Sequence, residues 1–353
     1  MLPVFSLFSL LSGAGWAAPF DSGSQDAELS VEQQLTRDRL LTQFDAHFFP
    51  ERVEDIAMLE RIEMTEEHRG FSCLTGLVRD LKDNWELFSV QERAEMTGIL
   101  APWKRDLLES SPPPPSNADS PCVNPSDGYV DDRDNQVLGD HFSVEWDSGA
   151  NQTKAENFLE SLEFSWEMQI DEWDWEEPTG TSRYPMLAYI AQGNYASAYT
   201  TVDWCSGQGW VPYIVAFAGS FSSGNWYQDM AGHEFNHAVQ YAYGYAHEFW
   251  WWEATATWVE EYVYDSHNSW SDYVWGYSEN PWIALNSSSQ SDTDIFYHMY
   301  GMAQLGFYLD QHVGGHEMVR GTWEVAAEDG GTYSLWLPDA IEDMGYDWSE
   351  IYT

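Results

Sequence analysis

Two histidines and a glutamate in the stretch GHEFNHAVQYAYGY, residues 232–245, have types and a spacing that could bind a metal ion. His233 and His237 are four residues apart, which places them one turn apart on one face of a helix. Two imidazole nitrogens on one face can bind a single zinc ion. Glu234 lies beside them, where a carboxylate takes a proton from an attacking water instead of binding the metal. The H-E-x-x-H pattern also arises by chance on ordinary helices, so a third ligand must decide.

A third histidine from the same helix is excluded by the residues that follow. The extended pattern H-E-x-x-H-x-x-G-x-x-H needs glycine and histidine where this chain has Gln240 and Tyr243. His247 is a stray candidate, but it falls in the turn after the helix. The third ligand must therefore come from another element.

Glutamates on the next predicted helix, FWWWEATATWVEEYVYD, are better placed. A short connection makes the two helices an antiparallel pair. At about 1.5 Å per residue along each helix, Glu253 comes nearly level with His237. Glu260 lies nearer the level of His233, where it could accept a hydrogen bond from the second nitrogen of that ring. This count does not exclude Glu260 or Glu261 as the ligand.

The elements that position these residues follow from the spacing of apolar side chains. The spacing predicts strands at 141–146, 184–191 and 211–219, and helices at 154–169, 224–243 and 249–265. Gly244 is a natural stop for the second of these helices. Strands precede helices, which indicates an α+β fold. We expect 211–221 to be the edge strand against which an extended substrate pairs.

The chain resembles a known family at these residues. HEFNHAVQ followed by WWWEATATWVEEYVYD is similar to the gluzincin zinc metallopeptidases, and most similar to secreted metalloproteases of myxobacteria and their relatives. FSVEWD, FLESLEFSWE and YGMAQLGFYLDQHVGGHEMVRGTWE extend the resemblance over most of 141–328. It implies a zincin-like catalytic domain with Zn²⁺ held by two histidines and Glu253. Two departures are Ala254, where the family has glycine, and Thr257, where many gluzincins carry an acidic residue. The similar proteins continue beyond the end of this sequence, so we expect a short form or a fragment.

The resemblance also implies an activity, the hydrolysis of peptide bonds with Glu234 as the general base. A peptidase needs a donor for the oxyanion that develops during attack, and gluzincins use a Tyr or His from a downstream helix. The predicted helix at 294–309 offers Tyr297, His298 and Tyr300. Tyr300 is the first choice because a glycine follows it, as in the similar proteins. No G-x-M-E-N-like sequence is present, which favours an endopeptidase over an aminopeptidase.

The N-terminal part is predicted to be distinct from the catalytic part. Residues 1–17, MLPVFSLFSLLSGAGWA, are apolar and end in small residues, which predicts a signal peptide and a secreted protein, extracellular or periplasmic. Residues 18–109 form a small helical region, and the proline-rich stretch 110–121 has the composition of a linker. Residues 122–353 then form the metallopeptidase domain.

Charge decides which partners are plausible. The chain of 353 residues has 14 basic and 59 acidic residues and a net charge of −45. Nucleic acid and anionic membrane surfaces would be repelled, whereas divalent cations would be attracted. We therefore expect no nucleic-acid partner. The resemblance implies a peptide or protein substrate, and the lack of a later apolar run long enough to cross a bilayer predicts no membrane insertion after signal removal. Oligomeric state and calcium binding are left open by the sequence.

The alternative function is a secreted binding protein without catalysis. It would be either a degenerate peptidase or a module that binds glycans or surfaces through some of its 20 tryptophans. Such residues more often pack in cores, as FWWWEATATW indicates. The chain contains both HEFNH and Glu253, which a degenerate peptidase would be expected to lose, so the sequence favours a catalytic protein over a binding protein.

Three cysteines, in an oxidising compartment, predict one disulfide and one spare thiol. Cys73 with Cys122 is the preferred pair, with Cys205 left over. The sequence contains no Cys-x-x-Cys or Cys/His cluster, so it predicts no structural zinc site.

Overall fold

A mixed sheet of six strands is the centre of the described structure. The computed structural model describes residues 29–53, 72–102, 135–194, 196–205, 209–222, 224–244, 249–289, 292–328 and 337–351. The strands are β1 (Ser72–Cys73), β2 (Gln136–Leu138), β3 (Phe142–Trp146), β4 (Met186–Ala191), β5 (Ser197–Cys205) and β6 (Gly209–Phe217). Their order in space is β1-β5-β6-β4-β3-β2. β3, β4 and β6 are parallel neighbours, β5 is antiparallel to β6, and β1 adds to β5 in parallel.

Helices lie before, between and after the strands along the chain. The α-helices are α1 (Val31–Phe48), α3 (Thr75–Asp83), α4 (Val90–Leu100), α6 (Gln152–Trp166), α7 (Trp226–Ala242), α8 (Phe249–Val263), α9 (Val274–Ser278), α10 (Thr293–Gly301), α11 (Ala303–Tyr308), α12 (His316–Glu328), α13 (Leu337–Asp343) and α14 (Trp348–Ile351). Short 3-10 segments are η1 (Pro50–Arg52), η2 (Trp85–Leu87), η6 (Ala218–Phe221) and η7 (Ser269–Tyr273), and π-helical turns are η5 (Glu167–Glu172) and η8 (Leu309–Gly314).

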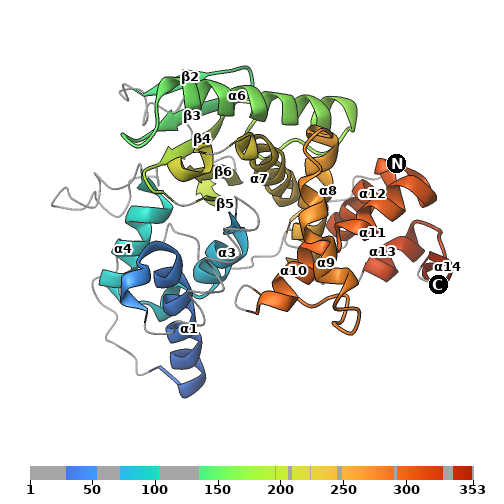
Figure 1. The fold of residues 1–353 in the computed structure, drawn as a ribbon, viewed down its shortest axis with the longest axis horizontal. Helices are drawn as coiled ribbons and strands as arrows, with labels where there is room; N and C mark the ends of the chain where they lie inside the picture. Colours follow the sequence, from blue (N-terminus) through green and yellow to red (C-terminus); the bar gives the residue numbers. More distant parts are fainter. Residues whose placement is uncertain are drawn as a thin grey trace, which may run out of the picture.

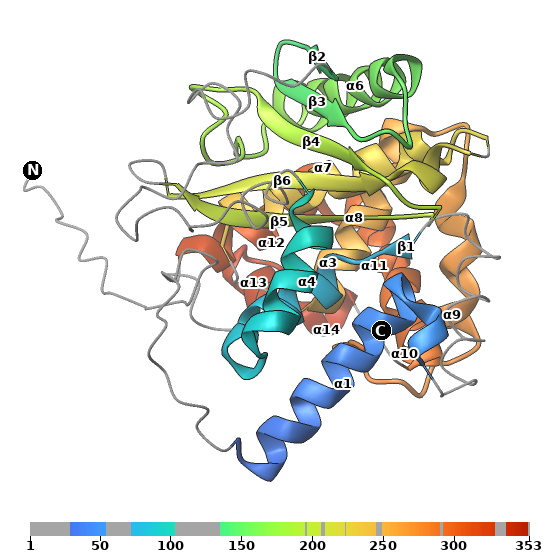
Figure 2. The ribbon, with the colours of Figure 1, turned by 90° about the vertical axis from the view of Figure 1, so that its left-hand side faces the viewer.

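Side chains that alternate along the central strands build two cores, because successive residues of a strand point to opposite faces. Tyr189 and Tyr199 belong to a core shared with α1, α3 and α4. Ile190 and Ala198 belong to a larger core shared with α6, α7 and α8. Figure 2 shows α1, α3 and α4 in front of the sheet and α7 and α8 behind it. The sheet is thus the middle layer of three, and the C-terminal helices gather beyond α8 (Figure 1).

Local signals set several helix ends. Ser30 and Ser89 begin α1 and α4 with reciprocal capping boxes, in which the serine side chain accepts a hydrogen bond from the backbone three residues on. Helix α7 ends just before Gly244, which adopts φ +88°, a conformation that favours glycine. The predicted stop at Gly244 is confirmed.

The fold class predicted from the sequence agrees with the structure at a coarse level: it is mixed, with a small sheet and many helices, and compatible with α+β. The strands predicted at 141–146, 184–191 and 211–219 correspond to β3, β4 and β6. The three predicted helices correspond to α6, α7 and α8.

One prediction about the sheet is wrong. Residues 211–221 do not form an edge, because β6 lies between β5 and β4. The outer long strand on that side is β5, which the sequence did not predict, and among the described residues only the two-residue β1 lies beyond it.

Several N-terminal predictions lie outside the described residues, namely the signal peptide at 1–17, the linker at 110–121 and Cys122. The described parts of 18–109 contain α1, α3 and α4, two short 3-10 segments and β1. In the described part of the chain, no helix has the length and hydrophobicity needed to cross a membrane.

Candidate metal centre

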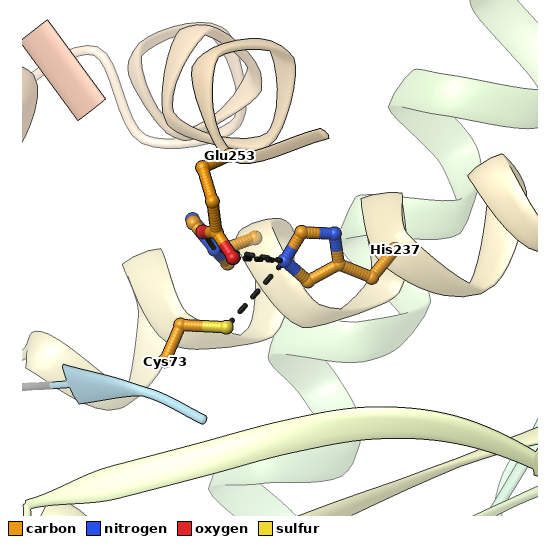
Figure 3. Close-up of side chains that lie close together, drawn as sticks. Cys73, His237 and Glu253 are labelled. Carbon is orange, nitrogen blue, oxygen red and sulfur yellow. Dashed lines mark hydrogen bonds and ion pairs between the residues drawn. The ribbon is translucent and has the colours of Figure 1, made fainter. Parts of the chain in front are cut away.

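Four metal-binding side chains converge at one buried point between the helices and the sheet. Cys73, His233, His237 and Glu253 each direct one ligand atom to it, and these atoms lie within 4.8 Å of one another. All four residues are fully buried. Figure 3 shows Cys73, His237 and Glu253 approaching the point from different elements. The cluster could hold a metal ion.

Helix α7 supplies the two histidines. Their rings come from adjacent turns, and the two Nε2 atoms are 3.1 Å apart. The helix is buried along almost its whole length, and its Gly232 packs closely against Val263 of α8. A Cβ at residue 232 would lie 3.4 Å from Cβ of Val263, an ordinary van der Waals distance, so the two helices are in close contact here.

Helix α8 supplies Glu253, at the level predicted from helical rise. Its Oε2 lies 3.1 Å from Nε2 of His233, and its Oε1 lies 3.7 Å from Nε2 of His237. The structure therefore brings together the two histidines and the glutamate that the sequence had selected. Glu261 is not part of the cluster, and His247 lies outside the described residues.

The outer nitrogens of both rings are held by oxygen atoms. Nδ1 of His233 lies 2.6 Å from Oε1 of Glu260, the contact expected from the heptad spacing. Nδ1 of His237 lies 2.7 Å from Oε1 of Gln240. The Gln240 amide is oriented by its own donor, which contacts the oxygens of Asn236 and Trp252.

These contacts determine where the ring protons are. Carboxylate and amide oxygens accept hydrogen bonds, so the neutral rings carry their protons on Nδ1. Each Nε2 then directs a lone pair into the cluster, where the Glu253 oxygens also lie. Facing lone pairs repel unless a cation lies between them, so the donor set fits a metal ion.

Charge within the cluster adds a separate requirement, namely positive charge at this point. Burial lowers the pKa of His237, but the Cys73 and Glu253 charges outweigh burial and raise the pKa to about 10. For Glu253, burial raises the pKa, yet the neighbouring His237 and His233 hold it well below its usual range. A buried anionic group of this kind requires positive charge close by, supplied either by protons on the rings or by a metal ion.

The separations also fit a tetrahedral ion. Ligands at about 2.0–2.3 Å from a tetrahedral zinc ion are about 3.3–3.8 Å from one another. The observed distances are 3.1 Å between the two Nε2 atoms, 3.1 and 3.7 Å from Glu253 to the rings, and 3.5 Å from Cys73 Sγ to His237 Nε2. All four ligand atoms lie within 4.8 Å of one another, so modest side-chain shifts would bring them to the edges of such a tetrahedron.

Glu234 lies next to the cluster and is held on one side only. Its Oε2 faces the hydroxyls of Thr200, at 2.7 Å, and Thr75, at 3.2 Å. Its Oε1 is buried and has no hydrogen-bond partner among the described residues. One carboxylate oxygen is thus oriented by two hydroxyls, while the other is available to a water or a substrate.

Of the three candidates for an oxyanion donor, Tyr300 is the one whose ring stacks on a cluster residue. Its ring and that of His233 are nearly parallel, with centroids 6.0 Å apart. Tyr297 packs against Trp275, with centroids 4.4 Å apart. His298 lies beside Tyr277, and burial lowers its pKa.

Cys73 is the member of the cluster that sequence reasoning missed. Its Sγ lies 3.5 Å from Nε2 of His237, across 164 residues of sequence. Cys73 is a free, buried thiol, so the predicted disulfide with Cys122 is not formed. The sequence has no local Cys/His spacing that could have predicted this cluster, because the strand pairing of β1 with β5 brings Cys73 to it.

Comparison with known proteins adds no identification. No protein-family model matches the chain, and no curated protein matches it.

Proposed function

We propose that this protein is a secreted zinc-dependent peptidase of the gluzincin type, with a zincin-like domain that cleaves peptide bonds within a chain. The observation that carries the proposal is the convergence of His233, His237 and Glu253 beside Glu234. Two histidines from one helix and a glutamate from the next form a three-ligand set that suits catalytic zinc.

The chain's own residues would divide the work as follows. His233, His237 and Glu253 would hold the ion, with Glu260 and Gln240 fixing the ring orientation. When bound, zinc supplies a Lewis acid that polarises the peptide carbonyl and acidifies the attacking water.

Two further groups would act on the substrate. Glu234 takes a proton from the attacking water through its unpartnered oxygen and delivers it to the leaving amine. Tyr300 donates to the developing oxyanion. Thr200 orients the Glu234 carboxylate.

The first test is the metal content of the purified full chain, measured by elemental mass spectrometry after expression in zinc-containing medium. We expect about one zinc per chain. The same measurement on a His237→Ala variant should find almost none. A folded wild-type chain that has met no chelator and contains no zinc would contradict the proposal.

The second test concerns catalysis. The rate of cleavage of a fluorogenic peptide mixture should be measured for four proteins: wild type, Glu234→Gln, Cys73→Ser, and the double variant with both substitutions. Each protein with glutamine at residue 234 is compared with the one that differs from it only in keeping glutamate there. Loss of the general base should lower cleavage by about 10²–10⁴-fold while zinc stays bound. If the variants with glutamine at residue 234 cleave as fast as the proteins with glutamate there, Glu234 is not the general base.

A second candidate function is favoured by Cys73. A fourth protein ligand closes a metal site, and closed four-ligand sites are structural. On this hypothesis the protein is a secreted binding protein that keeps a peptidase-like fold around a permanent metal. This hypothesis predicts that zinc is bound and that neither the wild-type chain nor the Cys73→Ser variant cleaves peptides.

A further inference from the structure

Residues 72–82 contact the three parts of the site that a peptide substrate would need. This segment, named here the plug segment, comprises β1 and most of α3. It approaches the metal-binding atoms, the Glu234 carboxylate and the outer side of β5 at the same time. In Figure 3, Cys73 projects from its strand towards His237.

The first contact closes the metal centre. Sγ of Cys73 lies 3.5 Å from Nε2 of His237 and is one of the four ligand atoms of the cluster. The backbone N–H of Thr75 donates to the same sulfur, at 3.4 Å, from the first turn of α3. A catalytic zinc site needs three protein ligands and an open position, and here a thiolate would take that position.

The second contact is made to the carboxylate of the proposed general base. The hydroxyl of Thr75 donates to Oε2 of Glu234, at 3.2 Å, and accepts a hydrogen bond from the backbone N–H of Thr200, at 2.9 Å. The plug segment therefore contacts Glu234 and β5 through one side chain.

The third contact covers the outer side of β5. Ala198, Thr200 and Val202 alternate along the strand, so their backbone groups point away from β6. The N–H of Leu74 donates to the carbonyl of Ala198, at 2.7 Å. The N–H of Thr200 donates to the Thr75 hydroxyl, and Lys82 Nζ donates to the carbonyl of Val202. An extended peptide could pair with β5 only after these contacts are broken.

Apolar packing holds the plug segment in place. Leu77, Val78 and Leu81 are buried in the core shared with α1 and the sheet. The segment is therefore a folded part of this chain, and displacing it exposes apolar surface. Release needs an external event such as cleavage of the chain or engagement by a partner.

We propose that the plug segment is a built-in inhibitor, and that the full chain is the latent form of the peptidase. This inference rests on the proposed function. In the released form His233, His237 and Glu253 would hold the metal without Cys73, whose thiolate would take up a proton from solvent. The outer side of β5 becomes available in the same step, and Oε2 of Glu234 loses its contact with Thr75.

Cobalt substitution tests the coordination without measuring activity. The full chain should be loaded with Co²⁺ and its near-ultraviolet absorption recorded. A thiolate ligand gives a sulfur-to-cobalt charge-transfer band, which we expect in the wild type and not in Cys73→Ser, with one cobalt bound in both. Cys122→Ser and Cys205→Ser, the other two cysteines of the chain, are the matched controls and should keep the band.

Peptidase activity of the zinc-loaded chains tests latency. We expect Cys73→Ser to cleave a fluorogenic peptide mixture faster than wild type by a factor on the order of ten or more, because the fourth position is open to water. Melting curves should establish that each variant is folded. If Cys73→Ser does not fold, the wild-type spectrum compared with the two control variants still reports whether Cys73 binds the metal.

Each other outcome overturns the inference in a distinguishable way. A wild-type chain without the thiolate band, or one that cleaves as fast as Cys73→Ser, would end the latency proposal and leave the peptidase standing. Loss of metal from folded Cys73→Ser would make Cys73 a permanent structural ligand. Metal-loaded chains that are all inactive would overturn both the latency and the proposed function.

Discussion

The helix pair α7–α8 and the plug segment reach the same four-atom cluster by different routes. The helix pair supplies its ligands through local spacing, four residues along α7 and one short connection to α8. The plug segment supplies Cys73 through two residues of strand pairing with β5 and the packing of α3 on the opposite layer. The difference teaches that one region can bring metal-binding groups together by local spacing, while another, independently anchored, adds a further such group from a distant part of the sequence.

Removing a ligand from the helix pair should have the largest effect. His237→Ala leaves a two-residue set within α7 and α8, so metal affinity should fall by at least about a thousandfold. Competition with a chromophoric chelator measures this. His312→Ala, an exposed histidine, is the control and should leave affinity unchanged. Comparable losses in both variants would show that the helix pair is not the metal-binding unit.

Weakening the packing of the plug segment should have the next largest effect, a loss of stability. The resulting increase in amide exchange should be confined to this segment. Leu77 is 1% exposed, so Leu77→Ala should cost about 2–5 kcal/mol. In hydrogen-exchange mass spectrometry, amides of 72–83 should exchange faster while those of α7 stay protected. Leu35→Ala, at a leucine that is 67% exposed, should change neither. Equal deprotection of α7 would mean that the two regions open as one unit.

Weakening the support of one ring should have a smaller effect. Glu260→Gln keeps the shape of the side chain that contacts Nδ1 of His233 but removes its charge, so metal affinity should fall by about 10–100-fold. The same titration on Glu261→Gln is the matched control, since the neighbouring glutamate is outside the cluster. Identical losses would indicate a general charge effect and not support of the ring.

The smallest expected effect is a pH dependence of stability on α8. Burial and the neighbouring Asp265 raise the pKa of Glu261 from 4.5 to about 7. The folded state therefore holds this proton more tightly than the unfolded state, and stability falls as pH rises through this interval. Glu261→Gln should raise the melting temperature on the order of 1–3 °C at pH 8, with the difference vanishing near pH 4.5.

The control for this last prediction is Glu317→Gln, which removes an equal charge from an exposed position. It should show no pH-dependent difference from wild type. A gain for Glu261→Gln that persists unchanged at low pH would assign the effect to net charge.

The sequence was sufficient for the helix pair because helical geometry is local. The spacing of His233 and His237 and the rise per residue along two adjacent helices placed Glu253 level with the rings and Glu260 behind one of them. The tryptophans of α8 are buried, as their surroundings predicted. Each of these inferences needed only a few neighbouring residues.

The parts that depend on strand order could not be read in this way. β5 carries buried polar residues such as Thr200 and Thr201, which blur the alternation that marks a strand. The position of β6 inside the sheet depends on pairing between distant segments, so the edge was assigned to the wrong strand. Cys73 was assigned to a disulfide because its partners in the cluster lie more than 150 residues away in sequence.

The covered outer side of β5 also bears on solubility. An uncovered strand at the border of a sheet is a template for pairing with another copy, which leads to aggregation. While β1, Thr75 and Lys82 cover β5, this route is closed. After their departure the net charge of −45 would be the remaining protection, because like-charged copies repel one another. The released form should therefore be the more salt-sensitive of the two, and high ionic strength should precipitate it first.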